Sequence, residues 1–392
     1  MRKDPVVIIG GGFAGVYTAK ELLKRKLPVL LISDTNHFTF TPMLHEVATG
    51  SLISHDVIFE YESFFSQEGF EFTRGLVDGI DPKGKTVSIG TDKIAYSQLV
   101  IATGSTTNLR DIKGAEHGFM LKNVEDAVKL KRAILSSAQD VDHQAEVTIV
   151  GGGPTGLELV FDIVLMLKAL RKKNSEVRFN VRLVNSKESL CLADVSTIMG
   201  YTNQSLEKAG VEVVCGAKAK EVSPSQVITS KGTFNSDVTV LVTGVCPNTD
   251  IFEKDIDLDD CGHIEVNEYM QTIQDSSIFA VGDVASIDGK PIPKLAQTAV
   301  REAPVVARNV AIMHRGSGES MRSYTPKVIG TLYSLGFGDG VGEIQGRVIK
   351  GVLAWYLWRT VYLFKTPGLS NKLRVAFSWT LGLFQGRNLT EL

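Results

Sequence analysis

Three glycines near the start of the chain have the spacing that a dinucleotide site requires. Gly10, Gly12 and Gly15 directly follow the apolar run Val6–Ile9, which is typical of a buried parallel strand. In such a unit the first glycine permits a tight turn, the second lets a pyrophosphate approach the backbone, and the third lets a helix pack on the strand. A helix beginning near Phe13 would direct its unpaired N–H groups and its positive dipole end at the phosphates.

A second strand and an acid complete this unit. The run Val29–Ile32 ends at Ser33 and Asp34, about where a Rossmann unit places the acid that binds a ribose hydroxyl. A GxGxxG motif alone is weak evidence, but here it follows one strand, opens a helix and precedes another strand. The segment therefore predicts a dinucleotide-binding unit.

The same pattern occurs again in the middle of the chain. Val147–Val150 is the expected strand, Gly151, Gly153 and Gly156 are the glycines, and Leu157–Leu170 is the expected helix. A further strand-like run, VRFNVRLVN, follows the helix. Two complete units predict two bound dinucleotides, and a flavin with a nicotinamide is the obvious pair because hydride passes readily between them.

Composition and charge limit the alternatives. A chain of 392 residues can form two or three domains, and a net charge of −2 gives no overall attraction to nucleic acid. Cys191, Cys215, Cys246 and Cys261 are too far apart for a zinc site or a CxxC redox pair, so we expect no metal and buried thiols in a reducing compartment. A strand starts almost at Met1, which leaves no room for a signal peptide and predicts a protein kept on the cytoplasmic side.

Beyond these motifs, the chain resembles the two-dinucleotide-binding-domain flavoproteins and, within them, the type II NADH:quinone oxidoreductases. The resemblance covers nearly the whole chain and rests on the aromatic C-terminal segment and on FTFTPMLHEVATGSL (38–52), RGLVDGID (74–81), LVIATGS (99–105), GGGPTGLELVFDI (151–163), AVGDVA (280–285) and KLAQTAVREA (294–303). It implies an FAD-dependent enzyme that takes hydride from NADH or NADPH and passes two electrons to a membrane quinone without pumping protons.

The resemblance also implies which residues bind FAD. In the family the N-terminal fingerprint holds FAD, and the aspartate of the GD pair, here Asp283, bonds the ribityl chain. The expected FAD contacts are Gly10, Gly12, Phe13, Ala14, Gly15, Ser33, Asp34, Thr41, Pro42, Val77, Ala102, Thr103, Gly104, Asp283, Ala296 and Gln297.

The second unit would then bind the nicotinamide dinucleotide. The expected contacts are Gly151, Gly153, Pro154, Thr155, Gly156, Glu158, Asn185 and Gly244. In the family a glutamate at the position of Glu158 is linked to nicotinamide positioning and proton delivery, although an acid in the first helical turn is also favourable in itself. Glu158 and Gln297 are thus the expected catalytic residues, and Asp162 lies one turn beyond Glu158 on the same helix face.

Asn185 stands where NAD-selective members carry an acid that repels a 2′-phosphate. An amide cannot repel a phosphate, and Ser186 and Lys187 beside it could bind one. This predicts that NADPH is accepted; the alternative is that Asn185 simply bonds the ribose hydroxyls.

The AQTAVRE stretch is the most specific part of the resemblance, because in the family it lies by the flavin and lines the quinone tunnel. The expected quinone contacts are Ala296, Gln297, Thr298, Val300 and Arg301. Arg301 stands where the family often has glutamine. A helix that packs Ala296, Ala299 and Val300 into a core would give the same pattern.

Two other classes remain open. ISDTNHFTF (32–40) is similar to a stretch of the sulfide:quinone oxidoreductases, but these need a cysteine late in the chain, and the last one here is Cys261. A non-enzymatic flavoprotein of the apoptosis-inducing type, acting as a redox-sensitive binding partner, would be expected to carry a strongly basic surface or an interaction tail.

The C-terminal segment 347–392 is rich in aromatic and basic side chains. Gly351–Phe364 is mostly apolar but too short to span a bilayer, which takes about 20 residues. One face of the following helix would present Leu373, Phe377, Leu381 and Phe384. The residues expected in the lipid headgroup zone are Trp355, Trp358 and Trp379. We expect two amphipathic helices on a bilayer surface, with a homodimer interface as the alternative.

The sequence therefore predicts an α/β protein with two Rossmann-like domains. The FAD domain would comprise 1–115 and 265–330, the NAD(P)H domain 116–264, and the membrane-associating C-terminal region 331–392. We expect a peripheral membrane protein on the cytoplasmic side of the cell membrane.

Overall fold

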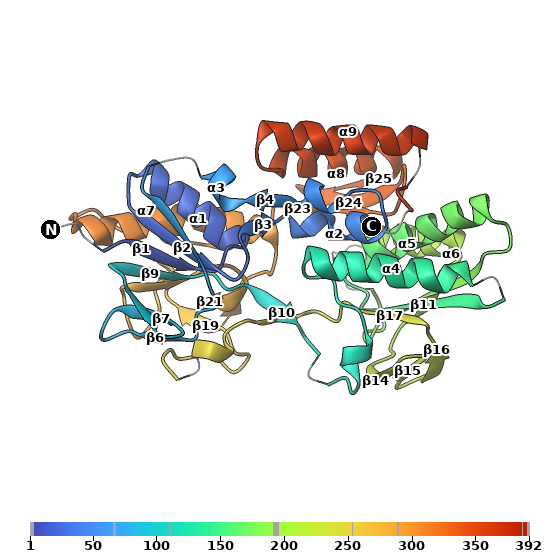
Figure 1. Cartoon of the computed structure of the whole chain (residues 1–392), viewed down its shortest axis with the longest axis horizontal. Coiled ribbons are helices and arrows are strands. Elements are labelled where there is room, and N and C mark those ends of the chain that lie inside the picture. The colour runs from blue at the N-terminus through green and yellow to red at the C-terminus, as the bar shows by residue number, and fades with distance from the viewer. Residues whose placement is uncertain are drawn as a thin grey trace. The chain divides into compact units, whose positions relative to one another are not determined.

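The structure is a computed structural model that describes residues 4–65, 68–109, 111–140, 142–190, 196–252, 254–287, 290–385 and 387–389. Contacts within the chain divide it into two compact units (Figure 1). Unit 1 comprises 1–39, 59–106 and 245–328, and unit 2 comprises 40–58, 107–244 and 329–392. This division by contacts does not test the predicted boundaries of the FAD and NAD(P)H domains, which stay a prediction.

Unit 1 is built on a parallel sheet of five strands in the order β20-β9-β1-β2-β5. Its strands and the two helices that pack along each other are β1 (Val6–Ile9), β2 (Val29–Ser33), β5 (Phe70–Arg74), β9 (Gln98–Ile101), β20 (Ile278–Ala280), α1 (Phe13–Lys24) and α7 (Ala296–Arg315). The predicted first strand and the helix from Phe13 are confirmed. Every residue of β1 is buried, as expected for a parallel strand covered on both faces.

Short elements complete unit 1. They are β3 (His37–Thr39), β4 (Ile58–Glu60), α3 (Tyr61–Phe64), β6 (Gly79–Asp81), β7 (Thr86–Ile89), β8 (Asp92–Ala95), β10 (Ser105–Thr107), β18 (Val245–Pro247), η4 (Asp250–Phe252), β19 (Ile264–Val266), η5 (Gly282–Val284), β21 (Ala285–Ile287) and β22 (Lys290–Pro291). Strands β6 to β8 form an antiparallel meander.

Unit 2 repeats the parallel design with four strands in the order β13-β12-β11-β17. Its elements up to residue 244 are η1 (Thr41–Met43), α2 (Leu44–Ala48), η2 (Ser54–Asp56), η3 (Ala115–His117), α4 (Val124–Gln139), β11 (Gln144–Val150), α5 (Pro154–Lys173), β12 (Arg178–Val184), α6 (Ser196–Ala209), β13 (Glu212–Val214), β14 (Ala219–Ser223), β15 (Gln226–Thr229), β16 (Gly232–Asn235) and β17 (Val238–Leu241). The second predicted fingerprint, strand then helix, is confirmed.

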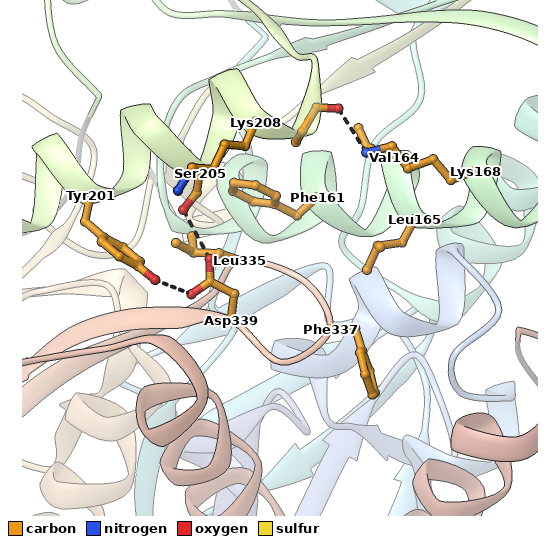
Figure 2. A pocket seen from close by; sticks show the side chains of 11 residues that line it. Phe161, Val164, Leu165, Lys168, Tyr201, Ser205, Lys208, Leu335, Phe337 and Asp339 are labelled. Atoms are coloured by element: carbon orange, nitrogen blue, oxygen red, sulfur yellow. Dashed lines mark hydrogen bonds between the residues drawn. The ribbon is translucent and has the colours of Figure 1, made fainter.

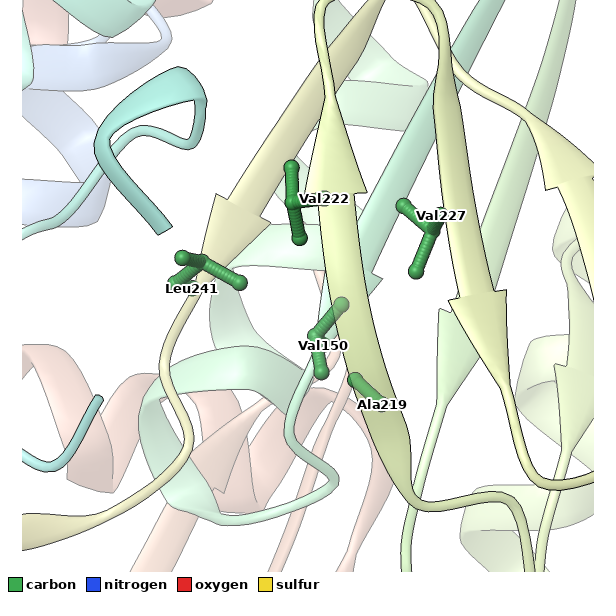
Figure 3. Packing of buried hydrophobic residues seen from close by; sticks show 5 residues of the cluster. All are labelled: Val150, Ala219, Val222, Val227 and Leu241. Atoms are coloured by element: carbon green, nitrogen blue, oxygen red, sulfur yellow. The ribbon is translucent and has the colours of Figure 1, made fainter. Parts of the chain in front are cut away.

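A small apolar cluster joins the antiparallel sheet β14–β16 to the ends of β11 and β17 (Figure 3). It consists of the buried side chains Val150, Ala219, Val222, Val227 and Leu241. Because Val150 immediately precedes the fingerprint glycine Gly151, this packing also fixes the strand end that positions the turn.

The C-terminal part of unit 2 is an antiparallel sheet covered by helices. It comprises β23 (Gly330–Ser334), β24 (Gly340–Ile344), β25 (Arg347–Lys350), α8 (Gly351–Lys365) and α9 (Leu369–Gln385). Helix α8 packs on β23 and β24, and α9 lies along α8 (Figure 1). The two predicted C-terminal helices are confirmed, and none of the described helices has the length and apolar character needed to cross a membrane.

The apolar cluster gives a direct test of this packing. Val227 is fully buried, whereas its neighbour Ile228 on β15 is 36% exposed. We expect Val227→Ala to lower the free energy of unfolding by about 1.5–3 kcal/mol, because apolar contacts are lost and a cavity remains. Ile228→Ala is the matched control and should cost far less. Denaturant titration followed by circular dichroism measures both, and equal costs would contradict the packing described.

Candidate functional site

The first fingerprint has the backbone of a phosphate cradle. Gly10 has φ +103°, and a Cβ there would lie 2.3 Å from the carbonyl oxygen of Ala102. A Cβ on Gly15 would lie 1.9 Å from the carbonyl oxygen of Gly10, so helix and strand approach as closely as predicted. In contrast, nothing lies within 4 Å of the Cβ position of Gly12. Because Gly12 caps α1 without a side-chain bond, the first N–H groups of the helix stay available to a phosphate.

The end of β2 carries the residues expected near the adenosine ribose. Ser33 is buried and its Oγ lies 3.3 Å from Oδ1 of Asp34, which is exposed. The phenol of Tyr61, which the sequence analysis did not single out, donates to the carbonyl oxygen of Gly11 at 2.9 Å and lies 3.4 Å from Ser33 Oγ. A carboxylate in this exposed position can accept from a ribose, so the residues fit the predicted role of Asp34.

The remaining FAD candidates are divided between the units. Asp283 lies in η5, and its Oδ2 accepts the hydroxyl of Ser105 at 2.6 Å. In unit 1, Val77 and Ala102 are buried, whereas Thr103 and Gly104 are half-buried at the end of β9. Thr41 and Pro42 open η1 and belong to unit 2.

The AQ stretch forms the first turns of α7. Ala296 and Gln297 are half-buried, and Thr298 is buried with no hydrogen-bond partner for its Oγ1 among the described residues. Val300 is half-buried, and Arg301 donates to the carbonyl oxygen of Lys327 at 3.4 Å. Of the three residues in the core-packing alternative, only Ala299 is buried, which leaves Ala296 and Val300 partly accessible to a ligand.

The second fingerprint repeats the first. Gly151 has φ +127°, a Cβ on Gly156 would lie 1.9 Å from the carbonyl oxygen of Gly151, and nothing lies within 4 Å of the Cβ position of Gly153. Pro154 and Thr155 are exposed at the start of α5, which also lacks a side-chain cap. The accessible backbone beyond Gly153 fits a second pyrophosphate. Gly244, the last candidate of this group, is exposed just beyond β17.

Asn185 uses its side chain to hold the loop that follows β12. Its amide nitrogen donates to the carbonyl oxygens of Lys187 and Ser189, at 3.0 and 2.7 Å, and its Oδ1 accepts the N–H of Gly152 at 3.3 Å. Both amide hydrogens are therefore engaged within the protein, and Asn185 is buried. Ser186 and Lys187, in contrast, are exposed. The direct ribose contact of Asn185 stays a prediction, and the neighbours are better placed to meet a 2′-substituent.

Glu158 and Asp162 meet one histidine that the sequence analysis did not assign. His45 Nδ1 bonds Oδ2 of Asp162 at 2.7 Å, and His45 Nε2 lies 3.7 Å from Oε2 of Glu158. Oε1 of Glu158 accepts the indole N–H of Trp358 at 2.7 Å and the backbone N–H of Ser334 at 3.1 Å. All three charged side chains are buried. The signal was present in the sequence, since LHE is a charged pair inside an otherwise apolar segment.

Burial and partner charges set the pKa values of this group. Burial raises the pKa of Glu158 to about 7, although the charge of His45 and the two N–H donors oppose the rise. Burial would lower the pKa of His45, but the bond to Asp162 and the charge of Glu158 outweigh it and raise the pKa to about 9. Burial alone would raise the pKa of Asp162, yet Arg387 and His45 lower it to about 2. Near neutral pH the His45–Asp162 pair is therefore ionised, and Glu158 is close to the midpoint of its own protonation.

The C-terminal segment closes the group. Arg387 donates to Asp162 Oδ1 at 2.5 Å and to Thr49 Oγ1 at 2.7 Å. Trp379 donates its indole N–H to Glu46 Oε2 at 2.8 Å, and the Arg359 guanidinium lies over the Trp379 ring at 4.7 Å.

These contacts correct one prediction. The three tryptophans expected in the lipid headgroup zone, Trp355, Trp358 and Trp379, are buried, at 7%, 1% and 6% exposure. They face inward because two of them donate indole N–H groups to buried acids and two stack against the Arg359 guanidinium.

The cysteines give a second correction. Cys261 is exposed and Cys215 and Cys246 are half-buried, so the prediction of buried thiols is wrong for these three, and Cys191 lies outside the described residues.

A surface hollow lies between α5, α6 and the β23–β24 loop (Figure 2). Asp339 accepts hydrogen bonds there from Tyr201, at 2.7 Å, and from Ser205, at 3.1 Å, while Phe161 and Leu335 form part of an apolar wall. None of the residues expected to bind FAD, the nicotinamide dinucleotide or quinone lines this hollow, so it is separate from the candidate site.

The charge pair at His45 makes stability depend on pH. A histidine whose pKa is higher in the folded than in the unfolded chain stabilises the fold below about pH 6.5, and this contribution disappears as the pH rises toward about 9. We expect His45→Asn to cost on the order of 3 kcal/mol at pH 6 and clearly less at pH 9. Thermal unfolding at both pH values, with exposed His117→Asn as control, measures this. A His45→Asn deficit that does not shrink at high pH would contradict the assignment.

Comparison with known proteins agrees with this geometry. A family model described as pyridine nucleotide-disulphide oxidoreductase matches residues 4–303, and one described as NDH2 C-terminal domain matches residues 329–388. The chain is 26% identical over 441 residues to the internal alternative NAD(P)H-ubiquinone oxidoreductase A1 of Arabidopsis thaliana, covering 100% of this chain and 86% of the relative. It is 27% identical over 418 residues to the type II NADH:quinone oxidoreductase Ndh of Mycobacterium tuberculosis, covering 98% and 89%.

A solved structure supports the fold. The NDH2 of Plasmodium falciparum in complex with NADH superimposes with a TM-score of 0.90 at 18% identity, over 99% of this chain and 100% of that one. The predicted α/β fold and the resemblance to type II NADH:quinone oxidoreductases are confirmed. The chain belongs to the pyridine nucleotide-disulphide oxidoreductase family and carries an NDH2 C-terminal domain.

Proposed function

We propose that this protein is an FAD-dependent NAD(P)H:quinone oxidoreductase. The observation that carries the proposal is the pair of complete fingerprints, each with an uncapped helix start and an accessible second glycine, in a chain that also has the AQ stretch. When bound, the flavin accepts hydride from the nicotinamide and passes two electrons to the quinone. The names of the relatives from Arabidopsis thaliana and Mycobacterium tuberculosis support this donor and acceptor.

The residues of this chain supply binding, orientation and a proton. Gly12 and Gly153 leave room for the two pyrophosphates. Asp283, whose Oδ2 already accepts the Ser105 hydroxyl, would bind the ribityl chain when FAD is bound. Glu158, with a pKa of about 7, can release and regain a proton near neutral pH, and the N–H groups of Trp358 and Ser334 hold its carboxyl group in place. Ala296 and Gln297, half-buried at the start of α7, are the proposed contacts to both flavin and quinone.

The runner-up classes are less well supported. A sulfide:quinone oxidoreductase would need a late cysteine, and the sequence has none after Cys261. A binding partner of the apoptosis-inducing type has no support from the C-terminal segment, because Arg359, Arg374 and Arg387 are engaged within the protein.

Docking to a bilayer is the proposed reason for the C-terminal helices. Their outer face exposes large apolar side chains, namely Val352, Leu353, Tyr356, Phe364, Leu369, Leu373 and Phe377. Leu381 is half-buried on the same helix, and the side chain of Phe384 lies outside the described part of the chain. An exposed patch of this kind marks a membrane or protein interface. We favour a peripheral position at a membrane, because a quinone acceptor is lipid-soluble, and the cytoplasmic side stays a prediction from the sequence. A homodimer through the same face is the alternative.

The electron transfer and the donor choice can be tested together by anaerobic stopped-flow absorbance. We expect NADH and NADPH each to bleach the visible flavin band, and a quinone pulse to restore it. Lys187→Glu should slow bleaching by NADPH about 10-fold more than by NADH, since an acid repels the 2′-phosphate. Lys172→Glu is the matched control, because it lies about 27 Å along α5 from the fingerprint. If sulfide bleaches the flavin band and neither nucleotide does, the protein is a sulfide:quinone oxidoreductase instead.

If the outer face of the C-terminal helices docks to a bilayer, an acidic residue placed on that face should weaken binding to lipid vesicles. Phe377 is 63% exposed, so Phe377→Glu should leave the fold intact. Because it places an acid in the apolar contact, we expect it to weaken sedimentation with anionic phospholipid vesicles by about 10-fold or more. Ile251→Glu, at an exposed site in unit 1, is the control. Unchanged vesicle binding together with a shift from dimer to monomer would favour the homodimer interface instead.

A further inference from the structure

Glu302 is a fully buried acid in the helix of the AQ stretch, and the proposed chemistry gives it no task. Its Oε2 accepts the backbone N–H of Gly282 at 2.6 Å, and its Oε1 has no hydrogen-bond partner among the described residues. Burial raises the pKa of Glu302 to about 7, although the Gly282 N–H and the charge of Lys294 oppose the rise. Burying a carboxyl group costs desolvation free energy that packing alone does not recover, so its hydrogen bond indicates a role.

The carboxyl group of Glu302 fixes the turn that carries Asp283. Gly282 has φ +81°, and a Cβ there would lie 2.9 Å from the Cβ of Ala14, so the turn lies directly against the fingerprint helix α1. From the other side, Lys294 Nζ donates to the carbonyl oxygens of Asp283 and Ala285, at 2.7 and 3.2 Å. Two side chains therefore hold the turn: Glu302 of α7 through the Gly282 N–H, and Lys294, just before α7, through the two carbonyl oxygens.

We infer that Glu302 is a positioning residue for FAD, which holds the Gly282–Asp283 turn against the fingerprint helix and whose negative charge opposes electron uptake at the bound flavin. The inference rests on the proposed function, because it requires FAD in the N-terminal fingerprint. Glu302 acts through Gly282 and Asp283, and through its charge.

The charges around Glu302 come from several elements. Asp283 and Lys294 lie on the side of the turn, and burial lowers the pKa of Lys294. Tyr324 follows α7; burial first, and then the charge of Glu302, raise its pKa to about 12. Helix α1, which packs along α7, carries Tyr17, Lys20, Glu21 and Lys24, and α7 itself carries Arg301 beside Glu302. Because the pKa of Glu302 is about 7, its ionisation near neutral pH changes the charge at this turn by one unit.

Three variants separate the hydrogen bond from the charge. Glu302→Gln keeps an acceptor oxygen but cannot ionise, Glu302→Ala removes both functions, and Glu319→Gln alters an exposed acid of the same unit as control. We expect Glu302→Ala to weaken FAD binding by about 10-fold or more, because the Gly282 N–H loses its partner. Glu302→Gln and Glu319→Gln should retain FAD as the wild type does. Gel filtration followed by the ratio of flavin to protein absorbance measures retention.

The charge is tested by the midpoint potential of the bound FAD, measured with redox dyes and a chemical reductant. At about pH 8.5 Glu302→Gln should have a higher potential than the wild type, which carries the charge, and at about pH 6 the two should converge because wild-type Glu302 is then protonated. Glu319→Gln should follow the wild type throughout. A difference that is equal at both pH values, or equal FAD loss by the Gln and Ala variants, would overturn the inference.

These readouts need neither nucleotide nor quinone. If NAD(P)H fails to reduce a wild-type protein that binds FAD, the proposed electron donor is wrong while the test of Glu302 still stands. If the wild type binds no FAD at all, both the proposed function and this inference fail.

Discussion

The interaction on which the packing of the C-terminal segment in unit 2 depends is the buried ion pair between His45 and Asp162. It brings α2, α5 and the segment after α9 to one point, because Asp162 also accepts from Arg387. Burying charges costs several kcal/mol per ion, and the pair recovers this only if every partner is present. Removing one partner leaves an uncompensated charge and costs about 3–5 kcal/mol. The network therefore acts less as a source of net stability than as a requirement for one arrangement, in which the C-terminal segment packs on α5.

That requirement explains why the C-terminal helices have two different faces. The inner face supplies indole N–H groups to Glu158 and Glu46, which a leucine in place of Trp358 or Trp379 could not do. The outer face supplies the exposed apolar side chains. A tryptophan in an amphipathic segment is compatible with a headgroup position, but a buried acid without a donor costs more than a tryptophan gains at an interface. The inward placement follows from that comparison.

The parts of the fold that the sequence predicted are those determined within about thirty residues. Both strand–glycine–helix units were identified because β-branched runs, glycine spacing and helix starts are local signals, and the two C-terminal helices were identified from their periodicity. Asn185 shows the limit. Its position after β12 was predictable, but its bonds to Gly152, Lys187 and Ser189 depend on the course of a loop, which no spacing encodes.

The residues that were missed are those whose partners are distant in sequence. His45 and Asp162 are 117 positions apart, Asp162 and Arg387 are 225 apart, and Glu46 and Trp379 are 333 apart. A charged pair in an apolar segment signals that a buried partner exists, but not which of many acids or bases it is. The protonation of Glu158 also depends on long-range packing, because a carboxyl group at a helix start would be stabilised as the anion if it were not buried. Burial decides its state instead: it raises the pKa of Glu158 to about 7, while the charge of His45 and the N–H groups of Trp358 and Ser334 oppose the rise and keep the pKa near neutral.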